Sequence, residues 1–498
     1  MITTWLIFGT ILIFTMHSHS LKNPSLIAKY ISPASDMILE KVIVIHRHGD
    51  RAQISKKLGT KYPESSVITD KWSTKMPKKS SLLTMMLSAG PHPYVSVDRG
   101  QAINTQAHLY AGWDNVNFPY AQLTELGYTQ MREVGKALRS RYCPELLSSS
   151  MKAGAPSLYC RSTSMCRTGQ SLRSLLSGLF DVNPREEQNE IIQFSDIQDA
   201  PSIVIRPFEE ENMYPHGGGD ALRQRQNTIA PHQQAEKQFP HYRDLEKRVM
   251  QMFGLSRKVD WHTITEVLHC QHVHEIDHVE GISQSDRDRF SEIAAWQWGA
   301  IYKDELFNRI AIGRFIYDLL ADLKSALSHR CPDHIAQSPI TSTSDTERVA
   351  TQGKTMLIYS GHDTTLVPVL SALGLYDDTW PPYASHLAVE VASKKSDPHS
   401  LFVRAVFNNQ EMSMFQDSST MWCPLEKFWR RLEASAVSPR QFEQACNQVT
   451  MVDQEGQEGQ EGDEEDIDDS ADAEMTAKEV EREVVETKAK RSTPSRTD

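Results

Sequence analysis

The sequence predicts an α/β protein with a doubly wound, mostly parallel sheet and an inserted, mainly helical second domain. Short apolar runs at 42–45, 157–160 and 355–359 are typical of strands that are buried on both faces of a parallel sheet. Stretches with helical spacing of apolar residues follow some of these runs, at 124–141 and at 168–180. Strands that alternate with helices indicate a layered α/β fold.

The order of these patterns predicts how the domains are arranged. We expect the α/β core to comprise residues 38–205 together with 350–450. The segment 206–349 is rich in histidine, glutamine and charged residues, and 290–326 within it has the pattern of long helices. We therefore expect 206–349 to be the inserted helical domain.

Residues 1–20 have the character of a targeting segment. Their apolar run is about 15 residues long, shorter than the roughly 20 that a membrane-spanning helix needs. Ser18-His19-Ser20 has the small-x-small pattern of a signal-peptidase site, although the usual positive charges before the apolar run are missing. We expect a cleaved signal peptide and a secretory-pathway protein, secreted or endolysosomal. The alternative is an uncleaved membrane anchor.

The charge of the chain is concentrated at its C-terminal end. Residues 453–498 hold 17 acidic and 6 basic residues, a net charge of −11, whereas the whole chain carries −12. The body is therefore nearly neutral, which argues against nucleic-acid binding through an overall basic surface. Segment 451–498 contains too little apolar surface to fold, and we expect an acidic, disordered tail.

Polar residues follow each of the three apolar runs. Parallel strands place their carboxyl ends at one edge of the sheet, and ligands bind there. We therefore expect side chains more than 300 positions apart to meet in one pocket. Arginine side chains match phosphate oxygens, histidine can act as a nucleophile, and a carboxyl group can protonate a leaving oxygen. The residues expected to converge are Arg47, His48, Arg51, Arg161, His362 and Asp363.

These motifs together resemble the histidine acid phosphatase family, branch 2 of the histidine phosphatase superfamily. The resemblance extends over roughly 42–446, nearly the whole body. Shorter stretches, among them 222–225 and 380–383, resemble the lysophosphatidic acid phosphatase subfamily. The motifs that carry the family resemblance occur in the expected order, at 47–51, 122–127, 161–163, 360–365, 381–385 and 423–426.

The resemblance implies an acid phosphatase that hydrolyses phosphate monoesters through a phosphohistidine intermediate. It implies that His48 is the nucleophile and Asp363 the proton donor. Arg47, Arg51, Arg161 and His362 would hold the phosphoryl oxygens. The implied enzyme needs no metal and no cofactor, and its partner is a small-molecule phosphomonoester. A lipid substrate such as lysophosphatidic acid, and contact with a membrane surface, remain open, as does the oligomeric state. The alternative is an inactive relative that binds a phosphorylated ligand.

Two positions depart from the family pattern. Gln53 stands where the family usually has proline, and His386 stands where many relatives have cysteine, so the usual partner of Cys270 is missing. The seven cysteines are an odd number, and their pairing cannot be assigned from the sequence. The histidines between 262 and 278 match no strong zinc-binding spacing, and we expect them to be structural or solvated.

Overall fold

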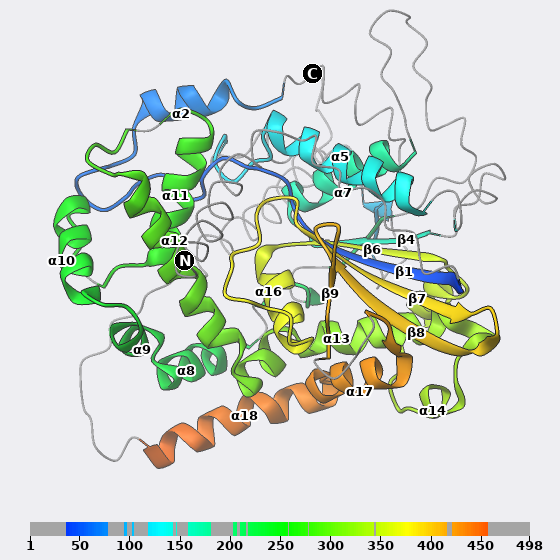
Figure 1. The fold of residues 1–498 in the computed structure, drawn as a ribbon. Coiled ribbons are helices and arrows are strands. Elements are labelled where there is room, and N and C mark those ends of the chain that lie inside the picture. The colour runs from blue at the N-terminus through cyan, green and yellow to red at the C-terminus, as the bar shows by residue number, and fades with distance from the viewer. Residues whose placement is uncertain are drawn as a thin grey trace, which may run out of the picture.

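The computed structural model of the chain is an α/β structure with helices on both faces of one ten-stranded sheet (Figure 1). The strand order is β10-β8-β7-β1-β6-β4-β5-β2-β3, and β9 pairs with β8. The structure describes residues 36–77, 94–96, 102–103, 118–142, 146, 158–180, 203–206, 210–215, 218–256, 258–276, 278–342, 345–415 and 421–456.

The centre of the sheet is parallel, as the sequence predicts. Neighbouring strands run parallel from β1 through β6, β4 and β5 to β2. The sequence did not reveal the antiparallel strands that extend the sheet beyond β1 and at β3. The strands are β1 Met37–Arg47, β2 Tyr94–Ser96, β3 Ala102–Ile103, β4 Leu158–Ser162, β5 Ile203–Ile205, β6 Met356–Gly361, β7 His386–Lys394, β8 Asp397–Phe407, β9 Gln410–Met412 and β10 Cys423–Pro424.

The apolar run of β1 is buried on both faces because its side chains alternate between two cores. Val42 and Val44 pack with residues of α5 and α7, whereas Ile43 and Ile45 pack with residues of α13 and α16. This double burial explains why the run has no polar positions. The helices that cover the two faces are α5 Glu125–Tyr142 and α7 Cys166–Leu179 on one side and α13 Glu305–Leu327, α16 Asp363–Ala372 and α17 Leu425–Ser435 on the other.

Between β5 and β6 the described chain is almost entirely helical. Side-chain caps begin three of its helices: Asp260 accepts backbone N–H groups of α11, Ser283 forms a capping box with Asp286 in α12, and Asp304 caps α13. Residues of α9 to α12 form a core of their own with Leu58, whereas α13 packs into the core of the sheet. The helices are α8 Gly219–Ile229, α9 Pro231–Gln238, α10 Tyr242–Phe253, α11 Trp261–Val273, α12 Gln284–Tyr302, α13, η4 Ser328–Arg330, α14 Asp333–Ala336 and α15 Asp345–Thr351.

The remaining helices are α2 Ser66–Ser73, beside the helical region, and α18 Pro439–Gly456, along the lower edge of the molecule (Figure 1). Residues 451–456 continue α18, so the helix extends six residues into the segment that the sequence predicts to be a disordered tail. The rest of that tail and the expected targeting segment 1–20 lie outside the described residues. Among the described residues, no helix combines the length and the apolar character needed to cross a bilayer.

Candidate active site

The strand ends of β1 and β6 bring five of the six expected residues together. The register of the two strands pairs Arg47 with Gly361, so His48 and His362 follow at the same edge of the sheet. The backbone N–H of His48 donates to the carbonyl oxygen of Gly361 at 3.0 Å. The chain turns at Gly49, where a Cβ atom would meet the carbonyl oxygen of Gly127 at 2.4 Å. Glycine is therefore required for this close approach.

The ring of His48 is held as a neutral imidazole with one free nitrogen. Its Nδ1 lies 2.8 Å from the carbonyl oxygen of Gly49. A carbonyl oxygen only accepts, so Nδ1 carries the hydrogen and Nε2 keeps its lone pair. Burial, and then the charges of Arg167, Arg47 and Arg51, hold the pKa of His48 well below its ordinary value. A neutral ring with a free Nε2 is the nucleophilic form of histidine.

Asp363 begins α16 and forms an ion pair with Arg47. Nη2 of Arg47 lies 2.7 Å from Oδ2 of Asp363, and both side chains are buried. Burial alone would raise the pKa of the Asp363 carboxyl, but the charge of Arg47, with those of His262 and Arg51, outweighs burial and lowers the pKa to about 2. Beside Arg47, Asp363 is therefore a carboxylate.

Arg47, at the end of β1, and Arg51, four positions later, both pack against the ring of Tyr383. The guanidinium carbon of Arg47 lies 4.0 Å from the centre of the Tyr383 ring, and that of Arg51 lies 5.6 Å from it. Nη1 of Arg47 also donates to the carbonyl oxygen of Pro381 at 2.6 Å. Arg51 forms an ion pair with Glu266 of α11. These contacts fix both guanidinium groups beside His48.

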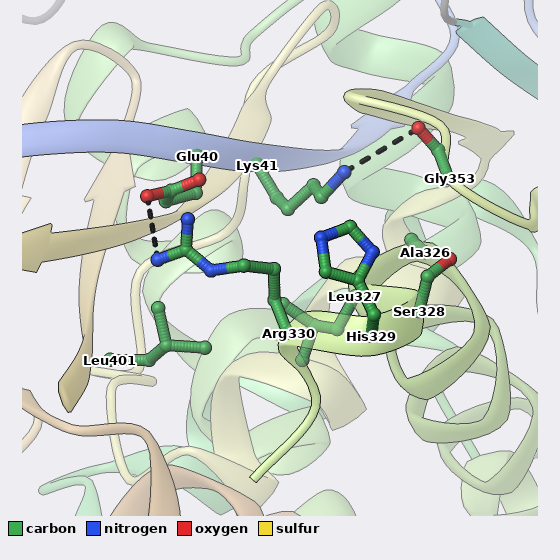
Figure 2. A pocket seen from close by; sticks show the side chains of 9 residues that line it. All are labelled: Glu40, Lys41, Ala326, Leu327, Ser328, His329, Arg330, Gly353 and Leu401. Carbon is green, nitrogen blue, oxygen red and sulfur yellow. Dashed lines mark hydrogen bonds and ion pairs between the residues drawn. The ribbon is translucent and has the colours of Figure 1, made fainter. Parts of the chain in front are cut away.

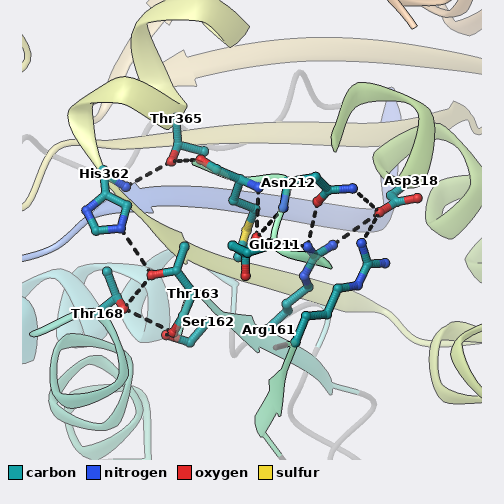
Figure 3. Close-up of polar contacts among 11 residues, drawn as sticks. Arg161, Ser162, Thr163, Thr168, Glu211, Asn212, Asp318, His362 and Thr365 are labelled. Carbon is teal, nitrogen blue, oxygen red and sulfur yellow. Dashed lines mark hydrogen bonds and ion pairs between the residues drawn. The ribbon is translucent and has the colours of Figure 1, made fainter. Parts of the chain in front are cut away.

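His362 completes the group around His48. The two ring centres are 5.5 Å apart, and Nε2 of His362 lies 3.1 Å from Oγ1 of Thr163, which follows β4 (Figure 3). Burial and the charge of Arg167 hold the pKa of His362 well below its ordinary value. Its ring is therefore neutral beside these charges.

Arg161 does not join this cluster, contrary to the expectation from the sequence. Its side chain extends from β4 toward α13 and away from His362 (Figure 3). It forms ion pairs with Glu211 at 3.1 Å and with Asp318 at 3.4 Å, and it donates to Asn212 at 2.6 Å. Residues along a strand alternate between its faces, and Arg161 lies on the α13 face. Its guanidinium is occupied by buried acidic and amide groups.

Arg167, in the first turn of α7, is the residue that the sequence analysis missed. Its charge has the largest effect of any neighbouring group in lowering the pKa of both His48 and His362. It is half-buried, and its Nε has no hydrogen-bond partner. Burial and the proximity of Arg51 lower the pKa of Arg167 to about 10. A helix N-terminus favours bound anions. The position of Arg167 in the first turn of the helix after β4 is therefore the feature of the sequence that could have identified it.

The arrangement is suited to an anion that carries several oxygen atoms. Three guanidinium groups, from Arg47, Arg51 and Arg167, surround a neutral imidazole, and a carboxyl group lies beside it. Such a site can bind a phosphoryl group, attack it from His48 and exchange a proton through Asp363. In the part of the chain that the structure describes, no group of three His, Cys, Asp or Glu residues is placed to hold a metal ion.

Of the two departures from the family pattern, Gln53 has hydrogen-bond partners, and His386 in place of cysteine leaves Cys270 as a free thiol. The Oε1 atom of Gln53 accepts from Trp72 at 3.1 Å and from Gln271 at 2.8 Å, while its Nε2 donates to the carbonyl oxygen of Ser55. Cys270 is a buried free thiol, 3.2 Å from the hydroxyl oxygen of Tyr383. Cys160, Cys331, Cys423 and Cys446 are also free thiols.

The histidines of and after α11 serve different contacts. Nε2 of His274 lies 2.5 Å from the Asp50 carboxylate, and Nδ1 of His278 lies 2.9 Å from Oε1 of Gln271. The ring of His262 packs against a different pair of residues, Trp298 and Trp380. Their neighbours are thus residues of the surrounding fold.

A separate pocket of about 290 Å³ lies near the opposite end of β1 (Figure 2). It is lined by Lys41, His329 and Arg330 together with apolar residues such as Leu401. Arg330 is paired with Glu40 at 3.1 Å. The pocket contains none of the residues around His48.

Comparisons with known proteins identify the family of this chain. The sequence pattern of the histidine phosphatase superfamily (branch 2) matches residues 38–408. The human lysophosphatidic acid phosphatase type 6 is 25% identical over 422 residues, which cover 83% of this chain and 87% of that protein. Counting factor 60 of Dictyostelium discoideum is 24% identical over 424 residues, covering 83% and 90% of the two chains.

A bovine lysosomal acid phosphatase is 27% identical over 334 residues, covering 66% of this chain and 72% of that protein. Among solved structures, a Hafnia alvei phytase in complex with myo-inositol hexakis sulphate superposes with a TM-score of 0.51 at 12% identity, covering 83% of this chain and 99% of that one. This structural similarity concerns the fold alone. Because the family pattern matches most of its length, the chain belongs to branch 2 of the histidine phosphatase superfamily and is a phosphoric monoester hydrolase.

Proposed function

We propose that the protein hydrolyses phosphate monoesters through a phosphohistidine formed on Nε2 of His48. The observation that carries this proposal is the hydrogen bond from Nδ1 of His48 to Gly49, which leaves Nε2 free beside three arginines. Nε2 attacks phosphorus, the bond from phosphorus to the ester oxygen breaks, and the leaving oxygen takes a proton from Asp363. Water then attacks phosphorus, Asp363 takes a proton from it, and the phosphorus–nitrogen bond breaks to release phosphate.

The phosphoryl oxygens are held by Arg47, Arg51, Arg167 and His362 in this proposal. Arg167 replaces Arg161, whose guanidinium is bound to Glu211 and Asp318. The guanidinium groups stabilise charge that develops on the transferred group. Their positive charge serves the purpose that a metal ion serves in other phosphoryl-transfer enzymes.

Asp363 must be protonated when the ester bond breaks. A bound phosphate dianion competes with the Asp363 carboxylate for Arg47 and adds like charge beside it. Both changes raise the pKa of Asp363 from the low value that Arg47 imposes. Substrate binding therefore supplies the condition for proton donation, and activity should fall as pH rises through neutrality.

We further propose lysophosphatidic acid as a candidate substrate. The similarity to the lysophosphatidic acid phosphatases of type 6 spans most of both chains and supports this choice. The activity is to be compared as kcat/KM for lysophosphatidate, p-nitrophenyl phosphate and inositol hexakisphosphate. A preference for inositol hexakisphosphate would contradict the lipid assignment.

The cell location that we propose is the secretory pathway, after cleavage near Ser20. Expression in a eukaryotic cell followed by N-terminal sequencing tests this proposal. A mature chain that begins near Leu21 and is found in the medium or in endolysosomes supports it. A chain that begins at Met1 and is recovered from the cytosol contradicts it, and a chain that keeps Met1 in membranes indicates the anchor.

The mechanism is tested by trapping the phosphorylated enzyme. Brief turnover of a labelled phosphomonoester, followed by denaturation, should leave an acid-labile and base-stable label on a peptide that contains His48. His48→Ala should abolish both the label and the activity. His46→Asn is the matched control, because His46 lies two positions before His48, near the end of β1, and Nδ1 of its ring lies 3.1 Å from the adjacent Arg47 carbonyl oxygen. Unchanged turnover in His48→Ala would end the proposal.

A further inference from the structure

Three aromatic rings from distant parts of the chain meet beside the candidate site. The ring centre of His262, at the start of α11, lies 4.9 Å from Trp298 of α12 and 4.8 Å from Trp380, in the loop between α16 and β7. The centres of Trp298 and Trp380 are 5.1 Å apart, and their planes are nearly perpendicular at 86°. We call these three residues the aromatic wall. All three keep partial exposure to solvent.

The aromatic wall lies on the Asp363 side of the site. Arg47 links the two, because it contacts the Asp363 carboxylate at 2.7 Å and the carbonyl oxygen of Pro381, next to Trp380, at 2.6 Å. His262 is close enough to Asp363 to contribute to its lowered pKa. The leaving oxygen of a bound ester would face Asp363, so the group attached to that oxygen would face the wall.

The rings of the wall differ from those of the cores. Tyr302 packs against Trp298 at 5.1 Å and is 3% exposed, as expected for a core residue. Trp298 and Trp380 retain exposed indole surface next to a buried charged site. Partly exposed indole rings offer a large, rigid apolar contact area with little loss of conformational entropy on binding.

The charges next to the wall oppose a polyanionic ligand. Asp377 and Asp378 precede Trp380 by two or three positions. Lys303 pairs with both carboxylate oxygens of Asp378 at 2.7 Å, whereas the Asp377 carboxylate accepts from the backbone N–H of Thr379. The charge of Lys303 is thus neutralised, and Asp377 adds an exposed negative charge three positions before Trp380. Like charges at close range disfavour binding.

We propose that His262, Trp298 and Trp380 receive the leaving alcohol of the substrate and select an apolar or aromatic alcohol over a polyphosphorylated one. This inference rests on the proposed function, because it requires the phosphoryl group at His48 and the ester oxygen at Asp363. The wall thereby makes the enzyme specific for phosphomonoesters of amphiphilic alcohols.

A series of n-alkyl phosphates tests the wall. Ethyl, butyl, hexyl and octyl phosphate share the same leaving-group chemistry and differ only in apolar surface. In the parent enzyme kcat/KM should rise by roughly four-fold for each methylene that is buried against the wall. Inositol hexakisphosphate should be at least about ten-fold poorer than hexyl phosphate, on the scale of one lost favourable contact.

Trp380→Ala should flatten this series, since the longer alcohols lose apolar surface that they contact in the parent enzyme. Trp298→Leu should have the same effect. The matched control is Trp296→Leu, which removes a ring of the same size from α12, where Trp296 packs against Phe239 at 5.6 Å. The control should keep the full dependence on chain length. Thermal unfolding of each variant verifies that the fold is retained.

These outcomes distinguish a failure of the proposed aromatic wall from a failure of the proposed phosphatase mechanism. The proposed role of the aromatic wall is wrong if the parent hydrolyses p-nitrophenyl phosphate but its kcat/KM does not depend on alkyl chain length. It is also wrong if Trp380→Ala keeps that dependence. In both cases the proposed phosphatase mechanism is unaffected. Faster hydrolysis of inositol hexakisphosphate than of hexyl phosphate would also contradict the proposed role of the aromatic wall. If the parent hydrolyses no phosphomonoester at all, the proposed function is wrong, and the proposed role of the aromatic wall is wrong as well.

Discussion

The Arg47 guanidinium lies 2.7 Å from the Asp363 carboxylate, and this ion pair keeps the proposed proton donor ionised. The same guanidinium is proposed to bind the phosphoryl group. A substrate that binds Arg47 therefore also changes the protonation of Asp363. Binding and proton donation are coupled through one side chain.

Asp363→Asn should slow esters of ordinary alcohols by roughly 10²–10⁴-fold, the usual scale of general acid catalysis. Nitrophenolate leaves without protonation, so p-nitrophenyl phosphate should be slowed much less. Single-turnover rates of phosphoenzyme formation with hexyl phosphate and p-nitrophenyl phosphate measure the two effects. Equal losses for both would mean that Asp363 positions other groups instead of donating a proton.

The same ion pair predicts how stability depends on pH. The pKa of Asp363 is lowered from 3.8 to about 2, so its contribution to stability is fully present above about pH 4 and is lost as pH falls through about 2. Between pH 5 and pH 2 the parent should lose about 2 kcal/mol more unfolding free energy than Asp363→Asn. Urea unfolding of both proteins at several pH values measures this difference. Parallel pH profiles would show that the carboxylate is not stabilised by Arg47.

The same substitution should lower stability at Arg161 and lower activity at Arg167. Arg161→Met leaves Glu211 and Asp318 with less compensation in the interior, so it should cost about 3 kcal/mol of unfolding free energy. Arg167→Met should leave stability nearly unchanged and lower kcat/KM by roughly 10²–10³-fold, the effect of losing one donor to the transition state. Denaturant unfolding and steady-state kinetics of both variants provide the test. If Arg161→Met were stable but inactive, Arg161 would have to be counted among the residues of the active site.

Gln53→Leu should destabilise the protein without removing a reactive group. The substitution leaves the indole N–H of Trp72 and the amide of Gln271 without their buried acceptor, at a cost of about 1–3 kcal/mol. Thermal unfolding measures the loss, and kcat at a temperature where both proteins are folded should change little. A stable variant would show that water replaces the lost acceptor.

The sequence was sufficient to predict which strands meet. The runs that became β1, β4 and β6 are neighbours in the parallel sheet, and this places Arg47 and His362 at one edge. It was not sufficient to predict on which face each side chain lies. Arg161 and Thr163 are two positions apart at the end of β4, yet Arg161 contacts α13 and Thr163 contacts His362.

This difference has a physical reason. Side chains two positions apart share a face only while the strand stays extended, and β4 ends at Ser162. The turn into α7 then redirects the chain and brings Arg167 into the site. The antiparallel strands after β6 were missed for a related reason. Their burial depends on a position at the end of the sheet, which local patterns do not encode.

The position of β1 in the middle of the sheet affects how the protein is synthesised. Its two neighbours, β6 and β7, are made more than 300 residues later. At about 5–20 residues per second, the apolar strand waits roughly 15 to 60 seconds on the ribosome before the first of these neighbours is made. During this time it exposes unpaired backbone groups and valine and isoleucine side chains, which is the state that chaperones recognise. Translation speed and chaperone supply, more than the final stability of the sheet, should therefore limit the yield of active enzyme.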